Sequence, residues 1–165
     1  MPFPETQPAT SPPDELVQRM EIGALLDRYL IGLDEKEIDD TWATSLFTSD
    51  ACVEFPVGKH EGIDGLVAFH RTAMEKFVRT QHLNSGAVVD IEGGHATVRA
   101  NLISTQVNRT RPDTAVTGPV SPPGSLFTTG TYVRGEARHG AHGWRFQRLS
   151  FQLVWATGEP PTLRN

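Results

Sequence analysis

Asp34 and His82 are the side chains whose types and positions best suit acid–base chemistry. Asp34 follows Leu26 and Leu30 at steps of four, so it continues the apolar face of an expected helix and should point inward. The negative end of a helix dipole disfavours an ionised carboxylate, and burial acts in the same direction. Both effects would raise the pKa of Asp34 towards that of a usable general base or a protonated donor. The alternative is that Asp34 caps a second helix by accepting a backbone N–H near Glu37.

His82 opens an expected strand directly after a helix. A neutral imidazole near pH 7 can take up a proton and return it, as a syn elimination or an enolisation requires. Tyr29 lies one turn before Leu33 and is placed to offer its hydroxyl to a substrate carbonyl, which would stabilise a developing enolate. The alternative for each is structural: a hydrogen-bonded histidine of the core or rim, and a tyrosine packed in the core.

Four aromatic residues are candidates for the apolar walls of a ligand site, although packing alone also explains them. They are Trp42, Phe47, Phe55 and Phe69. The remaining histidines and acids show no spacing typical of metal ligands, so no metal site is expected. The chain has no glycine-rich phosphate loop and no dinucleotide-binding fingerprint, so no cofactor is expected either.

Composition narrows the class of protein. The 165 residues are enough for one domain with a substantial core. A net charge of -5 argues against nucleic acids and anionic membranes as partners, and no apolar run approaches the ~20 residues of a membrane span. Cys52 is the single cysteine, so an intrachain disulfide is excluded and a buried, inert thiol is expected. Without a recognisable signal peptide at the start, a cytoplasmic location is the default expectation.

The pattern of apolar residues predicts helices first and long strands afterwards, which is typical of an α+β domain. The expected order is a disordered leader over 1–10, a helix from an N-cap at Ser11 to about Leu33, and a second helix opened by a capping box at 34–37. A strand over 51–57 and a helix over 63–78 follow. Two hairpins then pair 81–91 with 95–107 and 125–138 with 143–156. The domain should therefore span 11–157, with a long Pro/Gly loop over 108–124 and a C-terminal tail over 158–165.

Several segments together resemble the SnoaL-like branch of the nuclear transport factor 2-like superfamily. They are Leu26-Asp27-Arg28-Tyr29 continuing to Asp34, Trp42, residues 46–51, residues 61–63, Thr80-Gln81-His82-Leu83-Asn84-Ser85 and residues 143–146. The resemblance implies a cone in which three N-terminal helices pack in a curved, mostly antiparallel sheet around a pocket for a small organic molecule. It places His82 at the position of the catalytic histidine of scytalone dehydratase.

The chain also departs from individual relatives. Scytalone dehydratase has a second histidine on the following strand, where this chain has Asn101, which can hydrogen-bond a ligand but cannot relay a proton. SnoaL-type cyclases carry an acid late in the sheet, and none occurs between Trp144 and Trp155. An epoxide hydrolase of this fold needs an Asp–Arg–Asp trio. Asp34 and Arg99 would have to be joined by a second inward acid, and the sequence offers no convincing one.

These observations lead to one expected function and two alternatives. The first is a cofactor-independent lyase, isomerase or cyclase acting on a small hydrophobic, carbonyl-bearing or polyketide-like molecule, with Asp34, His82 and Tyr29 as the catalytic residues. The second is a module that binds such a ligand without turning it over. The third is the small subunit of a ring-hydroxylating dioxygenase, with a partner covering outward residues near Phe151, Leu153 and Trp155. In each case a homo-oligomer, most simply a dimer through the sheet, is expected.

Overall fold

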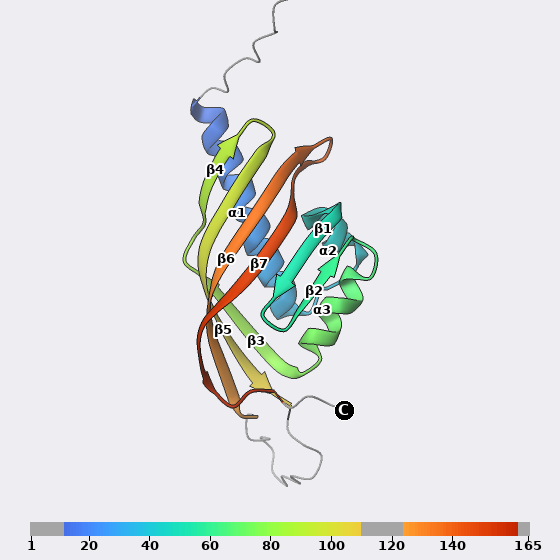
Figure 1. Cartoon of the computed structure of the whole chain (residues 1–165), viewed down its shortest axis with the longest axis vertical. Helices are drawn as coiled ribbons and strands as arrows, with labels where there is room; N and C mark the ends of the chain where they lie inside the picture. The colour runs from blue at the N-terminus through green and yellow to red at the C-terminus, as the bar shows by residue number, and fades with distance from the viewer. Residues whose placement is uncertain (1–11, 110–123, 162–165) are drawn as a thin grey trace, which may run out of the picture.

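The computed structural model describes residues 12–109 and 124–161, and within them three helices pack against a curved seven-stranded sheet (Figure 1). The helices are α1 (Pro12–Glu35), α2 (Asp40–Leu46) and α3 (Leu66–Met74). The strands are β1 (Phe47–Phe55), β2 (Gly58–Glu61), β3 (Phe77–Asn84), β4 (Val88–Glu92), β5 (His95–Asn108), β6 (Leu126–Gly140) and β7 (Gly143–Gly158). The expected α+β class is confirmed. The expected leader and most of the expected loop over 108–124 lie outside the described residues.

The sheet is mixed and built around two long hairpins. Its strands follow the order β2-β1-β7-β6-β5-β3, and β4 pairs with the first half of β5. Only β1 and β7 run parallel among these pairs. The sheet curls around α1, which lies across its inner face (Figure 1). A right-handed twist accumulated over such long strands gives the sheet its curvature.

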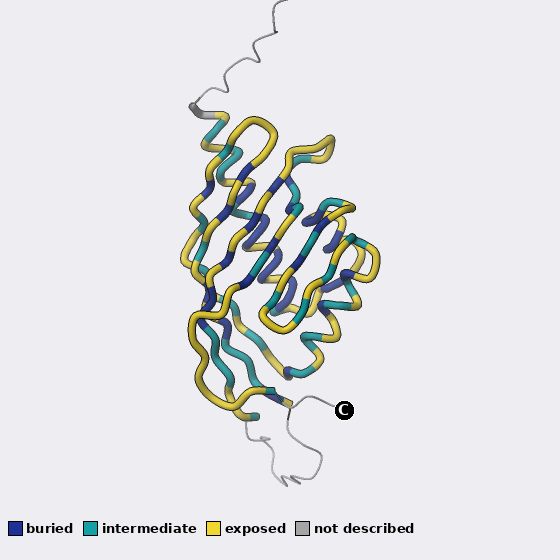
Figure 2. The backbone as a smooth tube through the Cα atoms, in the orientation of Figure 1, coloured by how far each residue is buried: buried dark blue, intermediate teal, exposed yellow. Residues whose placement is uncertain are grey.

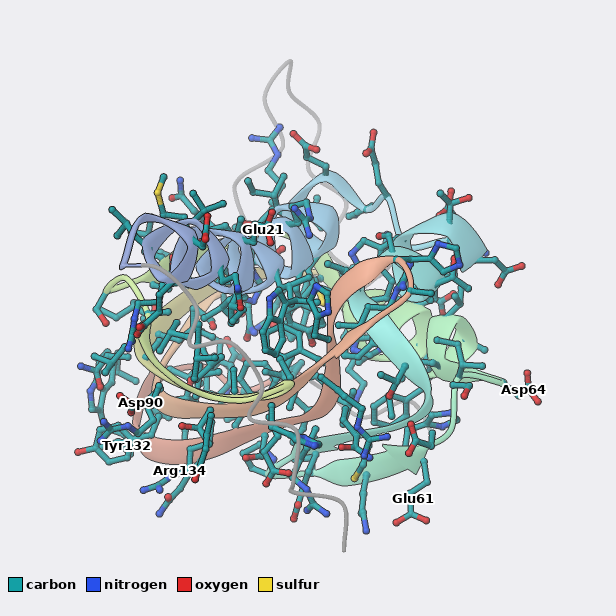
Figure 3. The ribbon with its side chains drawn as sticks, turned by 90° about the horizontal axis from the view of Figure 1, so that it is seen from above. Glu21, Glu61, Asp64, Asp90, Tyr132 and Arg134 are labelled. Carbon is teal, nitrogen blue, oxygen red and sulfur yellow. The ribbon has the colours of Figure 1, made fainter. Side chains whose placement is uncertain are left out.

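Alternation along the strands separates an inner from an outer face. In β6, Val133 and Ala137 are buried, whereas Tyr132 and Arg134 point away from α1 (Figure 3). The buried residues concentrate where α1 and α2 cover the sheet, and the far ends of β5, β6 and β7 carry mostly half-buried or exposed side chains (Figure 2). That end of the sheet is therefore packed less completely than the part that α1 and α2 cover.

Several helices and strands begin or end at other residues than the sequence predicts. The second helix begins at Asp40 rather than after a capping box at 34–37, and its N-cap is Asp39, whose side chain accepts the Trp42 N–H. The expected strand over 81–91 is two strands, because Gly86 adopts a positive φ of 81° between them. The third helix is shorter than the expected 63–78.

Two side chains differ from their expected burial. Phe151, expected near an outward surface that a partner would cover, is buried on the inner face, whereas Leu153 and Trp155 are about half exposed. Cys52, expected to be buried, is only half-buried on β1. The exposed apolar surface of β7 therefore begins after Phe151 rather than at it.

The apolar stripe of α1 is only partly buried. Leu26, Leu30 and Leu33 are in the core, but Leu16 and Met20 are 60% and 67% exposed. The helix begins near the edge of the sheet, and the apolar side chains of its first turns are mostly exposed (Figure 1). No helix in the described ranges is long and apolar enough to cross a membrane.

Candidate functional site

Asp34 and His82 lie in direct contact, although 48 residues separate them in the chain. Asp34 Oδ1 accepts a hydrogen bond at 2.6 Å from His82 Nδ1, and Asp34 Oδ2 accepts one at 2.9 Å from the His82 backbone N–H. Thr80 Oγ1 donates a third bond to Asp34 Oδ1 at 2.7 Å. Three donors on one carboxylate fix both its position and its orientation.

The end of α1 positions the carboxylate. Lys36 takes a left-handed conformation with φ 60°, and the Glu37 N–H returns to the Gly32 carbonyl at 2.9 Å, which closes the helix. Lys36 Nζ donates to the Val78 carbonyl at 2.9 Å and so ties the helix end to β3. Asp34 is thereby held against the inner side of the strand that carries Thr80 and His82.

The electrostatics of Asp34 differ from the sequence expectation. Burial raises the pKa of this carboxyl group, but the hydrogen bonds from the His82 ring, the His82 backbone and Thr80 outweigh it, so the pKa falls below its usual 3.8. The carboxylate is therefore ionised near neutral pH, and the expectation of a raised pKa is wrong. Asp34 also does not cap the second helix, since Asp39 does.

An ionised Asp34 makes His82 the group that can exchange a proton. The carboxylate keeps the proton of a neutral imidazole on Nδ1, which leaves the lone pair on Nε2. His82 Nε2 has no hydrogen-bond partner within the described part of the chain, and the side chain is 7% exposed against 22% for Asp34. A carboxylate that orients an imidazole and stabilises the imidazolium is the arrangement of a general base.

The wall beside His82 is polar. Ser104 on β5 is the cross-strand partner of His82, and Thr129 on β6 is the partner of Ser104. Ser104 is buried, and the hydroxyl of nearby Thr131 is buried without a hydrogen-bond partner among the described residues. Asn101, expected to bind ligand from this strand, is exposed on the outer face and lies apart from the pair.

Tyr29 forms a second, separate pair with His70. The hydroxyl of Tyr29 lies 3.0 Å from His70 Nε2, and His70 Nδ1 lies 2.8 Å from the Leu66 carbonyl. Since the carbonyl can only accept, His70 donates from Nδ1 and its Nε2 accepts from Tyr29. Burial raises the pKa of Tyr29 and lowers the pKa of His70 to about 4, so both are neutral. The hydroxyl hydrogen of Tyr29 is thus engaged in the core, which does not favour the expected contact with a substrate carbonyl.

The expected aromatic walls surround the Tyr29–His70 pair rather than an open site. Trp42 stacks on Tyr29 with ring centroids 5.6 Å apart, and Phe47 meets the same ring edge-on at 5.9 Å. Phe55 stacks on both Phe69 and Phe151, and it is only partly buried. Packing accounts for these contacts, which is the simpler of the two expected interpretations.

Two hollows lie elsewhere on the surface. One of about 370 Å³ lies beside the turn between β6 and β7, and one of about 260 Å³ lies over β5 and β6. Neither is lined by Asp34 or His82. Across the described residues, no group of three or more His, Cys, Asp or Glu side chains is placed to hold a metal ion.

Sequence reasoning missed Ser104 and His70, although the chain carries a signal for each. Along β5 the apolar residues Val98, Ala100 and Leu102 alternate with polar ones, which places Ser104 inward and Asn101 outward. On α3, His70 lies four residues after Leu66 and so shares its inward face.

Comparisons with known proteins show the family to which the chain belongs. The family model for the SnoaL-like domain matches residues 14–150. The chain therefore belongs to the SnoaL-like domain family, and its architecture is the cone of the nuclear transport factor 2-like superfamily. A sequence search of curated proteins gives no match.

Solved structures share the fold at low sequence identity. A protein from Kribbella flavida is 23% identical with a TM-score of 0.73, over 87% of this chain and 95% of that one. A putative scytalone dehydratase from Novosphingobium aromaticivorans is 20% identical with a TM-score of 0.70, over 87% and 88%. A hexachlorocyclohexane dehydrochlorinase from Novosphingobium barchaimii is 14% identical with a TM-score of 0.73, over 90% and 94%.

Proposed function

We propose that this protein is a cofactor-independent lyase or isomerase in which His82 removes a proton from carbon in a small hydrophobic substrate. The observation that carries the proposal is the pairing of His82 Nδ1 with an ionised Asp34 at 2.6 Å, which leaves Nε2 without a partner in the described chain. The substrate class is a molecule with an acidic C–H bond, next to a carbonyl group or beside a carbon that bears a leaving group.

The chemical step follows from the pair. His82 Nε2 accepts the proton, and Asp34 stabilises the imidazolium that forms. In an elimination, the electron pair of the broken C–H bond forms a carbon–carbon double bond while the leaving group departs with its own bonding pair. In an isomerisation, the same electron pair forms an enolate, and the imidazolium returns the proton to another carbon. In this proposal, Ser104 and Thr131 on the adjacent wall would hydrogen-bond polar groups of the substrate; the buried hydroxyl of Thr131, which has no partner among the described residues, supports that role.

The names of two structural relatives support this class of reaction. Dehydration and dehydrochlorination both remove a proton and a leaving group from neighbouring carbons, which requires a base but no cofactor. These names belong to proteins under 25% identical to this chain, so they support the class and not a particular substrate. A cyclase remains the weaker variant of the proposal, because the late sheet lacks the acid that such enzymes carry.

A module that binds without catalysis is the second candidate. The observation in its favour is that the Tyr29 hydroxyl is engaged by His70, so the expected donor to a substrate carbonyl is withdrawn. Under this alternative, Asp34 and His82 would hold a ligand by hydrogen bonds alone, and substitutions would change affinity only.

Proton exchange separates the two candidates even when the product is not identified. The full chain is incubated in D₂O with a panel of hydrophobic cyclic ketones, and deuterium at the α-carbon is followed by NMR; chloride release is followed with chlorinated cyclohexanes. We expect exchange or release with at least one compound, and a loss of about 10²–10⁴-fold in His82→Gln and Asp34→Asn. His95→Gln, at an exposed histidine, is the matched control and should keep the wild-type rate. Binding without exchange or release across the panel would favour the non-catalytic alternative.

The homodimer expected from sequence also stays a proposal. On the outer face, Leu83, Ile103 and Trp155 fall in one cross-strand row and are all exposed, with the Trp155 indole lying over Gly130. Sedimentation of wild type and Trp155→Arg tests whether this row joins two copies: we expect a dimer that the substitution dissociates, and a wild-type monomer would contradict it. The cytoplasmic location remains a prediction from sequence.

A further inference from the structure

The inner face of β5 carries a glutamine whose amide oxygen the fold does not use. Ser104, Gln106 and Asn108 point inward along this strand, and Thr80 on β3 is the cross-strand partner of Gln106. The Oε1 atom of Gln106 is buried and has no hydrogen-bond partner among the described residues. A buried acceptor without a donor destabilises a protein, so such an atom calls for an explanation.

The polar groups nearest to this oxygen have their hydrogens engaged elsewhere. Thr80 gives its hydroxyl hydrogen to Asp34 Oδ1 at 2.7 Å. Asn108 donates from Nδ2 to Ser125 Oγ at 3.1 Å and to the Glu159 carbonyl at 2.7 Å. Its own Oδ1 is a second buried acceptor without a partner in the described chain. The inner face of β5 therefore ends in two amide oxygens that lack donors.

Solvent reaches this part of the inner face. Gln106 lies on β5 between β3 and β6, and Thr129 lies on β6 between β5 and β7, so neither borders a free strand edge. Both point inward, and both are half-buried rather than buried. Their remaining exposure is therefore on the inside of the curled sheet, at the end where the side chains are less completely packed (Figure 2).

Gln106 is also close to the acid–base pair. His82 pairs directly with Ser104 across the two strands, and Gln106 is the next inward residue after Ser104. Diagonal neighbours on one face of an antiparallel pair are about 7–8 Å apart. A molecule of one or two rings spans that distance, so one end of a substrate can meet Gln106 while a carbon near its other end lies at His82.

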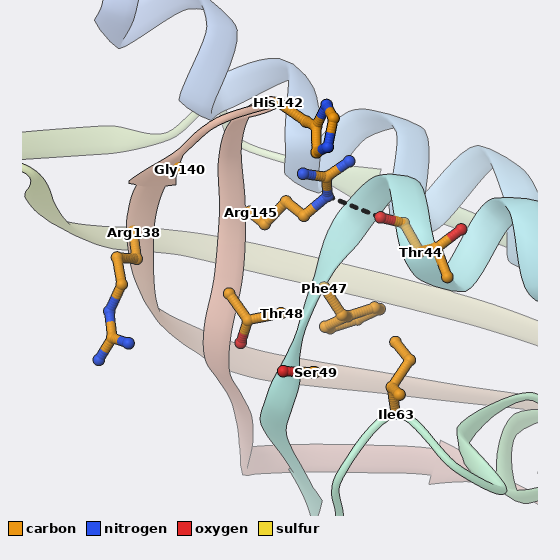
Figure 4. A pocket seen from close by; sticks show the side chains of 9 residues that line it. All are labelled: Thr44, Phe47, Thr48, Ser49, Ile63, Arg138, Gly140, His142 and Arg145. Carbon is orange, nitrogen blue, oxygen red and sulfur yellow. Dashed lines mark hydrogen bonds between the residues drawn. The ribbon is translucent and has the colours of Figure 1, made fainter.

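The larger hollow on the surface offers no comparable acceptor. Arg145 donates from Nε to the Thr44 carbonyl at 2.6 Å, and Arg138 lies on the other side of the hollow (Figure 4). None of the side chains that line it has a buried polar atom without a partner in the described parts of the chain. The unsatisfied groups therefore favour the inner face of β5 as the place where a ligand completes the hydrogen bonding.

We propose that the substrate of the Asp34–His82 pair carries a hydroxyl group that donates to Gln106 Oε1, so that Gln106 selects hydroxylated cyclic ketones over their unsubstituted analogues. This inference rests on the proposed function, because it places the substrate at His82. A hydroxyl group suits the buried oxygen better than a second carbonyl group, which brings no donor. Gln106 determines specificity and takes no part in the proton transfer.

Binding affinity, measured apart from turnover, tests the proposal. The ¹⁵N-labelled full chain is titrated with 2-tetralone and with its ring-hydroxylated isomers, and the dissociation constants are compared. We expect at least one isomer to bind about tenfold or more tightly than 2-tetralone, since its hydroxyl satisfies a buried acceptor. Gln106→Leu keeps the approximate size of the side chain without the amide, and it should remove this preference while 2-tetralone binds as before.

The variants are chosen so that misfolding does not decide the result. Gln106→Leu replaces an unpartnered polar atom by an apolar group and should fold at least as stably as wild type. Gln106→Met serves in its place if it does not. Gln152→Leu, at an exposed glutamine on β7, is the matched control and should keep the preference of wild type.

Two results would overturn the inference: no hydroxylated isomer binds more tightly than 2-tetralone, or the preference survives in Gln106→Leu. Proton exchange is measured separately on the same compounds. A preference that depends on Gln106 without any exchange would sustain the role of Gln106 and contradict the proposed catalysis. Exchange that depends on His82 without a hydroxyl preference would contradict the role of Gln106 alone.

Discussion

Asp34 contacts His82 twice, through the ring nitrogen Nδ1 at 2.6 Å and through the backbone N–H at 2.9 Å. The backbone bond fixes the strand against the helix end, and the ring bond fixes the imidazole. One carboxylate therefore sets both the position of His82 and which of its nitrogens is free. This double contact is what distinguishes the pair from a surface ion pair, whose two side chains are ordered only by each other.

The pH dependence of stability should report the ionised state of Asp34. Its pKa is below the usual 3.8 in the native protein, so the native state favours the carboxylate relative to the unfolded chain. That contribution is present above pH 3.8 and is lost as the pH falls through the native pKa. We expect Asp34→Asn to unfold more easily than wild type at about pH 6, and the difference to shrink below pH 3.8. Urea unfolding at a series of pH values measures it; a difference independent of pH would contradict the assignment.

His70 should make the free energy of unfolding depend on pH between about pH 4 and pH 6.5. Burial lowers its native pKa to about 4 from the ordinary 6.5, so between these values the unfolded chain binds more protons than the native one. Stability should therefore fall as the pH drops from 6.5 to about 4, by up to about 3 kcal/mol. His70→Gln should flatten this slope in urea unfolding, whereas His95→Gln, at an exposed position, should leave it unchanged.

Tyr29→Phe separates a structural role from a catalytic one. The substitution keeps the ring contacts with Trp42 and Phe47 but leaves His70 Nε2 buried without its donor. We expect a loss of about 1–3 kcal/mol in the free energy of unfolding and no more than a small effect on proton exchange at fully folded conditions. A variant of unchanged stability with abolished exchange would instead restore the role expected from sequence.

Gly135 offers a test of how closely the inner face of β6 is packed. A Cβ built there would lie 2.9 Å from the ring of Phe146, which is fully buried and cannot move aside freely. Gly135→Ala should destabilise the protein by about 1–3 kcal/mol. Gly140→Ala is the matched control on the same strand, with no atom within 4 Å of the added carbon, and should be close to neutral in thermal unfolding.

The fold could be predicted well because its signals are local. Periodic apolar residues indicated the long first helix, and extended runs joined at glycines indicated the hairpins that β4 forms with β5 and β6 forms with β7. The break between β3 and β4 was missed because it depends on the positive φ of Gly86, which a glycine permits but does not require. The second helix was misplaced because acids follow one another from Asp34 to Asp40, and only packing selects Asp39 as the cap.

The candidate site was predictable in its main pair but not in its surroundings. The apolar spacing before Asp34 and the strand position of His82 were enough to suggest that they meet. The direction of the Asp34 pKa shift was not predictable, because it depends on how many donors reach the carboxylate, and Thr80 and the His82 backbone are brought there only by the fold. The partner of Tyr29 lies 41 residues away on α3, and no local pattern specifies that contact.

Chemical rescue tests the central claim most directly. His82→Ala removes the imidazole and leaves space beside Asp34, and the α-proton exchange of a ketone that wild type exchanges in D₂O is then measured with and without added imidazole. If His82 Nε2 is the base, the variant should be slowed by about 10²–10⁴-fold, and free imidazole should restore part of the rate in a saturable way. A variant that exchanges as fast as wild type, or one that is slowed and does not respond to imidazole while remaining folded, would contradict the account.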